Sequence, residues 1–285
     1  MSIRNNYKHT FFASYAGYFV QAIINNFLPL LFLTFQNSFN LSYDKISLLI
    51  VINFGVQLCV DFISAYFIDK IGYRKSVIAA HVFACIGLAG LSIFPFIMEP
   101  YIGIILSIII YATGSGLIEV IISPLVEACP SDSKAGAMSL LHSFYCWGQA
   151  FTVIVTTVLI SLFGFKGWSY IPIVWAVIPF VNALIFLKTP IVEVVGEKKL
   201  ASMKELLSRK KFRGYMIMMV CAGACEIAMA QWASLFAQRG LGLSKALGDI
   251  FGPCAFALCM ATARVLYGIN AKKIPFKKLL LILSG

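Results

Sequence analysis

The acidic side chain of Glu119 stands well inside the apolar run GSGLIEVIISPLVEACP. Ser115 and Ser123 lie one helical turn to either side, so a helix would place all three on one face. A carboxylate inside an apolar helix is costly, and by default it indicates a functional group such as a proton carrier. The alternative is a structural acid that pairs with a neighbour such as His142.

A second polar face appears in AMSLLHSFYCWGQ, where His142, Tyr145 and Gln149 recur at helical spacing. A histidine can exchange protons near neutral pH, so His142 joins Glu119 as a candidate for proton coupling, although a helix-packing role is equally open. A sugar has an apolar face and a polar rim, and its binding sites combine aromatic rings with amides and acids. Within apolar runs, the predicted substrate-binding residues of these types are Gln21, Asn25, Asn26, Gln149, Glu226, Gln231 and Trp232. Trp232 could instead be an aromatic residue of the membrane interface.

A charged turn interrupts the apolar pattern in DFISAYFIDKIGYRKS and recurs in weaker form in RVLYGINAKKIPFKKL. One constant offset relates Asp61 to Arg264, Ala65 to Gly268 and Lys75 to Lys278. A charged turn that repeats between hydrophobic segments indicates a duplicated helical bundle.

Composition identifies the solvent of these segments. The chain has 285 residues, of which 60% are hydrophobic and only 12% are charged. A soluble protein of this length could not cover its surface with so few charges. The formal charge of +11 lies mostly in short turns, which argues for membrane orientation and against nucleic-acid binding. We therefore predict an all-α polytopic membrane protein.

Eight full spans and the start of a ninth are predicted from apolar runs of bilayer length. The full spans are expected at Thr10–Phe35, Ile46–Ile68, Val77–Met98, Tyr101–Val126, Met138–Phe163, Tyr170–Leu187, Tyr215–Phe236 and Leu247–Ile269. The short closing run KKLLLILSG reads as the opening turns of the ninth, so the chain is expected to be truncated at its C-terminus.

The distribution of Lys and Arg predicts a cytoplasmic N-terminus, because cytoplasmic loops carry the excess of positive charge. With that orientation only Lys45, Lys166, Arg239 and Lys245 fall outside. The long connection LASMKELLSRKKF is expected to form a cytoplasmic amphipathic helix at the membrane surface, or a solvated linker helix. The predicted division is a six-span bundle at 1–188, a linker at 189–213 and a partial second bundle at 214–285.

The stretch AYFIDKIGYRK resembles the signature between the second and third spans of the major facilitator superfamily, Gly-x-x-x-Asp-Arg/Lys-x-Gly-x-Arg/Lys-Arg/Lys. The resemblance implies parallel repeats of six spans and a turn that helps to close the cytoplasmic side. Ala65 departs from the preferred glycine, and Pro275 replaces the turn glycine of the second copy. The implied gating residues are Asp61, Ala65, Asp69, Lys70, Gly72, Arg74 and Lys75, with Arg264 and Gly268 in the second copy.

The fourth span is similar to the fucose–proton symporter branch of this superfamily, which carries an acid followed by Asn-Pro. Glu119 matches the acid, and Ser123-Pro124 stands in place of Asn-Pro. In that branch the acid takes part in proton coupling together with an acid in the first span. The first span here has Asn25 and Asn26 and no acid, which is a departure from the branch.

The resemblance implies a secondary transporter of a small, sugar-like solute that works by alternating access, with or without protons. Alternatives are an exporter of amphipathic compounds in the same superfamily, a non-transporting fragment, a receptor or a membrane enzyme. An enzyme is disfavoured because no catalytic set such as HExxH appears. The eight cysteines have no ligand spacing, so neither a metal nor a cofactor is expected. The protein is expected to be a monomer in the plasma membrane.

Overall fold

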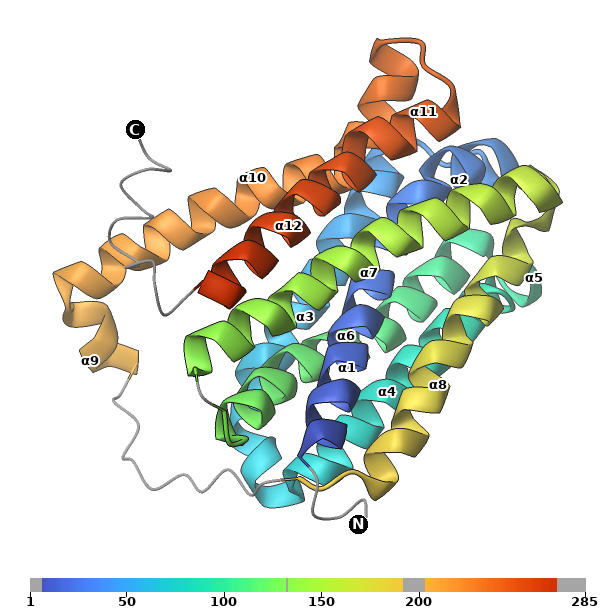
Figure 1. Cartoon of the computed structure of the whole chain (residues 1–285). Helices are drawn as coiled ribbons and strands as arrows, with labels where there is room; N and C mark the ends of the chain where they lie inside the picture. The colour runs from blue at the N-terminus through green and yellow to red at the C-terminus, as the bar shows by residue number, and fades with distance from the viewer. Residues whose placement is uncertain (1–6, 132, 192–202, 271–285) are drawn as a thin grey trace.

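The computed structural model describes residues 7–131, 133–191 and 203–270, and this part of the chain is built from helices (Figure 1). Eight of its helical segments are long and apolar enough to cross a bilayer, which confirms the predicted number of full spans. They are Lys8–Phe39, Tyr43–Ser64, Tyr73–Leu91, Pro100–Ala128, Lys134–Phe163, Gly167–Lys188, Lys210–Gly240 and Lys245–Asn270. The predicted ninth span lies outside the described residues.

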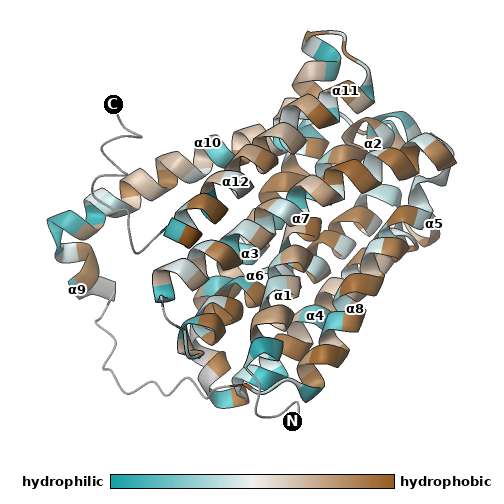
Figure 2. Ribbon diagram, in the orientation of Figure 1, coloured by the Kyte–Doolittle hydropathy of each residue, from teal (hydrophilic) through white to brown (hydrophobic). Residues whose placement is uncertain are grey.

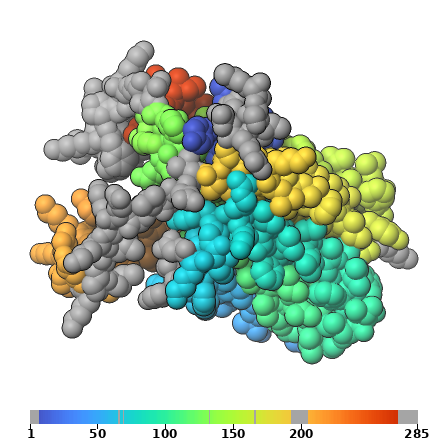
Figure 3. Space-filling model, turned by 90° about the horizontal axis from the view of Figure 1, so that it is seen from below, coloured from blue at the N-terminus to red at the C-terminus, as the bar shows by residue number. Residues whose placement is uncertain are grey.

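The first six spans pack into one bundle around α1 (Lys8–Phe27). This helix contacts α6 (Pro100–Ala128), α7 (Lys134–Phe163) and α8 (Ile171–Lys188). On the far side of α6 lie α3 (Tyr43–Ile71) and α4 (Tyr73–Leu91). Figure 3 views the end that carries the α3–α4 turn, where α8 adjoins α4.

Two glycines allow α4 and α6 to approach closely. A Cβ added at Gly87 would lie 2.4 Å from the backbone nitrogen of Tyr111, and one at Gly114 would lie 2.5 Å from the carbonyl oxygen of Ala80. Such contacts need glycine, since neither backbone can give way. The two helices are therefore held at a distance that larger side chains would not permit.

Three predicted spans are interrupted where the sequence carries proline. The first bends at η2 (Leu28–Leu31), which holds Pro29 and leads into α2 (Phe32–Phe39). The third ends early at Leu91, and its predicted last turn forms α5 (Phe94–Ile97) with Pro95. The eighth passes through the π-turn η4 (Ile250–Cys254) at Pro253. Proline cannot donate the helical hydrogen bond, so the backbone deviates at each site. A further 3₁₀ turn, η3 (Phe165–Tyr170), precedes α8.

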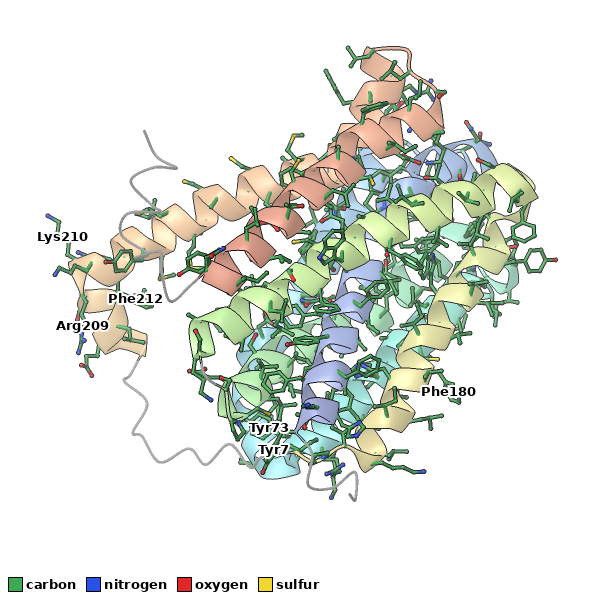
Figure 4. The ribbon with its side chains drawn as sticks, viewed as in Figure 1. Tyr7, Tyr73, Phe180, Arg209, Lys210 and Phe212 are labelled. Carbon is green, nitrogen blue, oxygen red and sulfur yellow. The ribbon has the colours of Figure 1, made fainter. Side chains whose placement is uncertain are left out.

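The later helices lie against one side of this bundle. They are α9 (Met203–Ser208), α10 (Lys210–Gly240), α11 (Lys245–Asp249) and α12 (Ala255–Asn270). α12 packs along α7, whereas α10 buries only Gln231, Ser234 and Ala237 in its second half. Of the predicted amphipathic helix, α9 covers Met203–Ser208, and the residues from Lys210 onward already belong to α10. Figure 4 shows Arg209 and Lys210 at the corner where α9 meets α10.

The outer surface of the bundle is apolar, as expected for a protein surrounded by lipid. Figure 2 shows brown, hydrophobic residues along the faces of the long helices. Phe180 on α8 points away from the bundle in Figure 4 and is 55% exposed. The polar residues of the spans are mostly turned inward, and this separation positions the candidate site.

Candidate functional site

A cavity of about 620 Å³ lies between the six-helix bundle and the pair α10 and α12. Six helices contribute to its wall, and the polar part of the lining comes from both sides. The lining residues are Tyr18, Gln21, Asn25, Phe54, Gln57, Leu58, Asp61, Glu119, His142, Tyr145, Gln149, Met219, Gly223, Glu226, Ile227, Ala230, Gln231 and Arg264.

Most of the residues singled out from the sequence meet in this one cavity. It gathers both proton-coupling candidates, Glu119 and His142, and five of the predicted substrate-binding residues, namely Gln21, Asn25, Gln149, Glu226 and Gln231. Asn26 and Trp232 do not line it. Trp232 instead packs against Phe32 with ring centroids 5.7 Å apart, beside a separate apolar pocket.

Glu119 is held by the first helix. Its Oε2 accepts a hydrogen bond of 3.0 Å from Nε2 of Gln21, and one turn further along α6 the hydroxyls of Ser123 and Tyr18 are 2.6 Å apart. Among the described residues Glu119 forms no ion pair, with His142 or with any other side chain. The structural alternative of a Glu119–His142 pair is therefore not what the geometry shows. The ring of His142 packs edge-on against Tyr18 at 5.1 Å.

An amide network in the cavity wall joins the four helices α1, α3, α6 and α10. Oδ1 of Asn25 accepts from Nε2 of Gln57 at 2.9 Å and from Nδ2 of Asn53 at 3.4 Å. Oε1 of Gln57 in turn accepts from the Ser115 hydroxyl at 3.0 Å. From the other side, Nε2 of Gln231 donates to the Asn25 carbonyl oxygen at 2.8 Å. Asn53 and Gln57 of α3 thus face neighbouring helices rather than lipid, because buried amides need partners.

Asn26 does not line the cavity but contacts Tyr145, which does. Its Nδ2 donates to the Ala22 carbonyl oxygen at 2.9 Å and to the Tyr145 hydroxyl at 3.3 Å. Since Tyr145 lines the cavity, Asn26 acts on the site through that ring rather than through direct exposure.

Four charged residues share the cavity wall, and they come from four helices. Asp61, Glu119 and Glu226 supply carboxylates, and Arg264 supplies a guanidinium. No ion pair joins any two of them in the part of the chain that the structure describes. Oδ1 of Asp61 and Nε2 of Gln149 are buried with no hydrogen-bond partner among the described residues.

The predicted gating turn connects α3 to α4. Gly72 ends α3 with φ +89, a conformation that favours glycine, and its N–H reaches the Ile68 carbonyl at 2.8 Å. Arg74 donates from Nη1 to the carbonyls of Phe186 at 2.8 Å and Leu187 at 3.1 Å, at the end of α8. Lys70 and Lys75 are exposed. Ala65 and Asp69 belong to α3, but their side chains lie outside the described part. The hydrogen bonds of Arg74 to described residues thus lie within the six-helix bundle.

The two predicted gating residues of the second copy, Arg264 and Gly268, lie in different surroundings. Arg264 lines the cavity, and its carbonyl accepts from the Ser139 hydroxyl of α7 at 2.8 Å. Gly268 lies where α12 crosses α7, and a Cβ added at Gly136 would come within 3.1 Å of its carbonyl. Asp61 and Arg264, which are related by the sequence offset, therefore both reach the cavity.

Sequence reasoning missed a polar cluster around Asp249, at the start of η4. An acid inside a predicted span was the signal, the same one that drew attention to Glu119. It also missed His81 of α4, whose Nε2 lies 2.8 Å from Nδ2 of Asn182 on α8 within the bundle core. The structure holds no group of three or more His, Cys, Asp or Glu side chains suited to a metal in its described residues.

Comparison with known proteins decides the family, because the sequence profile of the Major Facilitator Superfamily matches residues 10–285. The chain belongs to the major facilitator superfamily. A search of curated proteins found no match. This superfamily member also has the fold of solved transporters.

A D-xylose–proton symporter superposes with a TM-score of 0.67 at 14% identity, covering 94% of this chain and 68% of that one. A fucose:proton symporter from E. coli gives 0.64 at 17% identity, covering 93% and 71%. A POT family transporter in complex with a thioalcohol-conjugated peptide gives 0.51 at 18% identity, covering 85% and 48%. At these identities the likeness concerns the fold.

Proposed function

We propose that this superfamily member moves a small, polar, sugar-like solute across the plasma membrane by alternating access. The observation that carries the proposal is the cavity between the two sets of helices, which collects amides and carboxylates from both. In transporters built from two bundles, the solute site lies at their interface, where rocking can expose it to either side. The same cavity residues would bind the solute from opposite walls.

Gln21, Asn25, Gln149, Glu226 and Gln231 are the proposed hydrogen-bonding residues. Their amides and carboxylate offer both donors and acceptors, which suits the hydroxyl rim of a sugar. The unpaired Nε2 of Gln149 supports this assignment, because a buried donor without a partner is costly. Tyr145 offers an aromatic surface in the same wall.

Glu119 and His142 are the proposed proton-coupling residues. Glu119 lies in the wall without a cationic partner among the described side chains, so it can take up a proton and release it as its surroundings change. His142 lines the same cavity and has no described ion pair. The N-terminus is proposed to be cytoplasmic, with the α3–α4 turn on that side, and the protein is proposed to act as a monomer.

A thermal-shift screen against monosaccharides tests the solute class. A ligand stabilises the folded state by an amount that grows with its concentration over the dissociation constant, about 2.7 kcal/mol at a hundredfold excess. We expect a sugar to raise the melting temperature of the purified protein and of an Asp44→Asn control, and to lose most of that effect in Gln149→Leu. The absence of any shift across the sugars would contradict the proposal.

An exporter of amphipathic compounds is the second candidate. Phe54, Leu58, Met219 and Ile227 form an apolar part of the same lining, and such surface suits an amphipathic ligand. The same screen with amphipathic cations distinguishes the two candidates. Stabilisation by those compounds and not by sugars would favour export.

A further inference from the structure

Asp249 is a wholly buried carboxylate with an unusually complete set of partners. Its Oδ2 accepts from Nζ of Lys245 at 3.0 Å and from the Thr157 hydroxyl at 2.7 Å. Its Oδ1 accepts from the Ser234 hydroxyl, which Nε2 of Gln238 also approaches at 2.9 Å. We call Asp249, Lys245, Thr157 and Ser234 the α11 clamp.

The α11 clamp joins the two sets of helices. Thr157 belongs to α7 of the six-helix bundle, whereas Ser234, Lys245 and Asp249 belong to α10 and α11. Nζ of Lys245 also donates to the carbonyl of Leu30 in η2 at 3.1 Å. One carboxylate and one ammonium therefore hold four elements together.

The clamp lies at the end of the molecule opposite the α3–α4 turn, where α2 and α11 meet in Figure 1. A second polar contact crosses at this end, from Nη2 of Arg239 to Oε1 of Gln36 at 3.1 Å. The first half of α10 makes no comparable contact with the residues that the structure describes, and its residues from Lys210 to Ala230 are exposed or only half-buried. α10 is thus fastened to the bundle at this end, whereas α12 packs along α7.

Gln231 connects the clamp to the cavity. It lies one turn before Ser234 on α10, lines the cavity and donates to the Asn25 carbonyl. Both charges of the pair lie on α11, four residues apart, so the pair moves as one unit. The contacts that a movement of α11 would break are the hydrogen bonds from Thr157 and to the Leu30 carbonyl. Such a contact is either made or broken, which gives it two discrete states.

We propose that the α11 clamp is the outer gate of the transporter: the Asp249–Lys245 pair closes the cavity on the outer side, and it must part from Thr157 of α7 and from the Leu30 carbonyl for the solute to enter or leave there. This inference rests on the proposed function and on the proposed orientation. Asp249 and Lys245 are positioning residues in this role, since they do not line the cavity.

Thiol labelling from each side of the membrane tests the clamp without any solute. Ala230 lines the cavity, and an Ala230→Cys variant reports its accessibility to an impermeant maleimide, with the labelling of the parent protein subtracted. In Asp249→Asn we expect outside labelling to rise by roughly tenfold and cytoplasmic labelling to fall, because a broken gate shifts the population between two states.

Two further variants of the clamp and one control variant complete the test. Thr157→Val preserves the shape and removes one hydrogen bond, so it should give the same change to a smaller degree. Exchanging the charges, Lys245→Asp with Asp249→Lys, keeps an ion pair within α11 but removes the donor to the Leu30 carbonyl, so outside labelling should stay high. Asp44→Asn is the matched control, because Asp44 is an exposed acid in the first turn of α3 near the same end.

The labelling results distinguish a gate from a purely structural role of Asp249. Labelling that rises from both sides would mean that Asp249 only stabilises the fold, and this would overturn the gate. Labelling equal to the Asp44→Asn control in both Asp249→Asn and Thr157→Val would also overturn it. Failure of the sugar screen would count against the proposed solute while leaving these labelling results intact.

Discussion

Gln57 connects three helices through one side chain, with Asn25 and Ser115 as its partners. Replacing it by leucine would fill a similar volume, leave the Ser115 hydroxyl without this acceptor and leave Oδ1 of Asn25 with only the longer bond from Asn53. Because a buried polar group without a partner costs about 1–3 kcal/mol, we expect Gln57→Leu to lower the free energy of unfolding by about that amount. Thermal unfolding in detergent measures the change.

Thr262→Val is the matched control for the amide network. Thr262 is exposed on α12, and its hydroxyl reaches only the Leu258 carbonyl of its own helix. Such a surface change is expected to stay within about 0.5 kcal/mol. A similar loss in both variants would show that the network contributes nothing specific.

Glu119→Gln should separate proton coupling from solute binding. The amide is close in shape to the carboxylate and can still accept a hydrogen bond from Gln21, but it cannot carry a proton. We therefore expect proton-driven uptake into proteoliposomes to be abolished while solute exchange is spared. Uptake with an unchanged pH dependence would remove Glu119 from the coupling role.

The residue types of the cavity were predictable from sequence, whereas their pairing was not. A polar side chain in an apolar run is conspicuous, which is why Gln21, Asn25 and Glu119 could be named in advance. The neighbours Asn25 and Asn26 look alike in the sequence, yet only Asn25 lines the cavity, because helix geometry points Asn26 toward Tyr145. That difference depends on helix rotation, which composition does not encode.

The contact between α4 and α6 depends on glycine. In Gly87→Ala the new methyl would lie 2.4 Å from the Tyr111 nitrogen, so the helices would have to separate. We expect a loss of about 1–3 kcal/mol in the free energy of unfolding, as for other overpacked interiors. Thermal unfolding in detergent again gives the value.

Gly214→Ala provides the comparison. A Cβ at Gly214 on α10 meets nothing within 4 Å, and alanine is the better helix former by about 1 kcal/mol. This variant should be as stable as the parent or more so. Equal destabilisation by both alanines would contradict the close approach of α4 and α6.

Arg74 fastens the gating turn to the end of α8. Its guanidinium satisfies two carbonyls that have no helical partner and places a cation at a helix C-terminus. We expect Arg74→Ala to cost about 1–2 kcal/mol in the free energy of unfolding, read from the melting curve. Its exposed neighbour supplies the control, since Lys75→Ala should leave the melting temperature nearly unchanged.

The long helices follow directly from apolar runs, and their interruptions do not. All eight spans were expected, but the structure breaks three of them near Pro29, Pro95 and Pro253. Proline also lies inside α6 at Pro124 without ending that helix. Whether a proline bends or breaks a span depends on which neighbours can satisfy the freed carbonyl groups, and this is a property of packing.

At the scale of the whole molecule, the outer surface is apolar and the polar side chains lie between the helices. Its long helices present apolar side chains outward, and its polar residues gather at the cavity, the amide network and the α11 clamp. The charges of the loops were predictable as an orientation signal. The clamp was not, because it brings Thr157 of α7 against side chains of α10 and α11 that lie far from it in the sequence.

The orientation of the whole molecule is set by its loop charges. Ser38 at the end of α2 and Ser208 at the end of α9 are both exposed. With a cytoplasmic N-terminus, Ser38→Cys should react with an impermeant maleimide in intact cells, and Ser208→Cys should react only after permeabilisation. The parent protein gives the background from its native cysteines. The reverse pattern would invert the proposed topology and move the α11 clamp to the cytoplasmic side, where it would have to act as the inner gate.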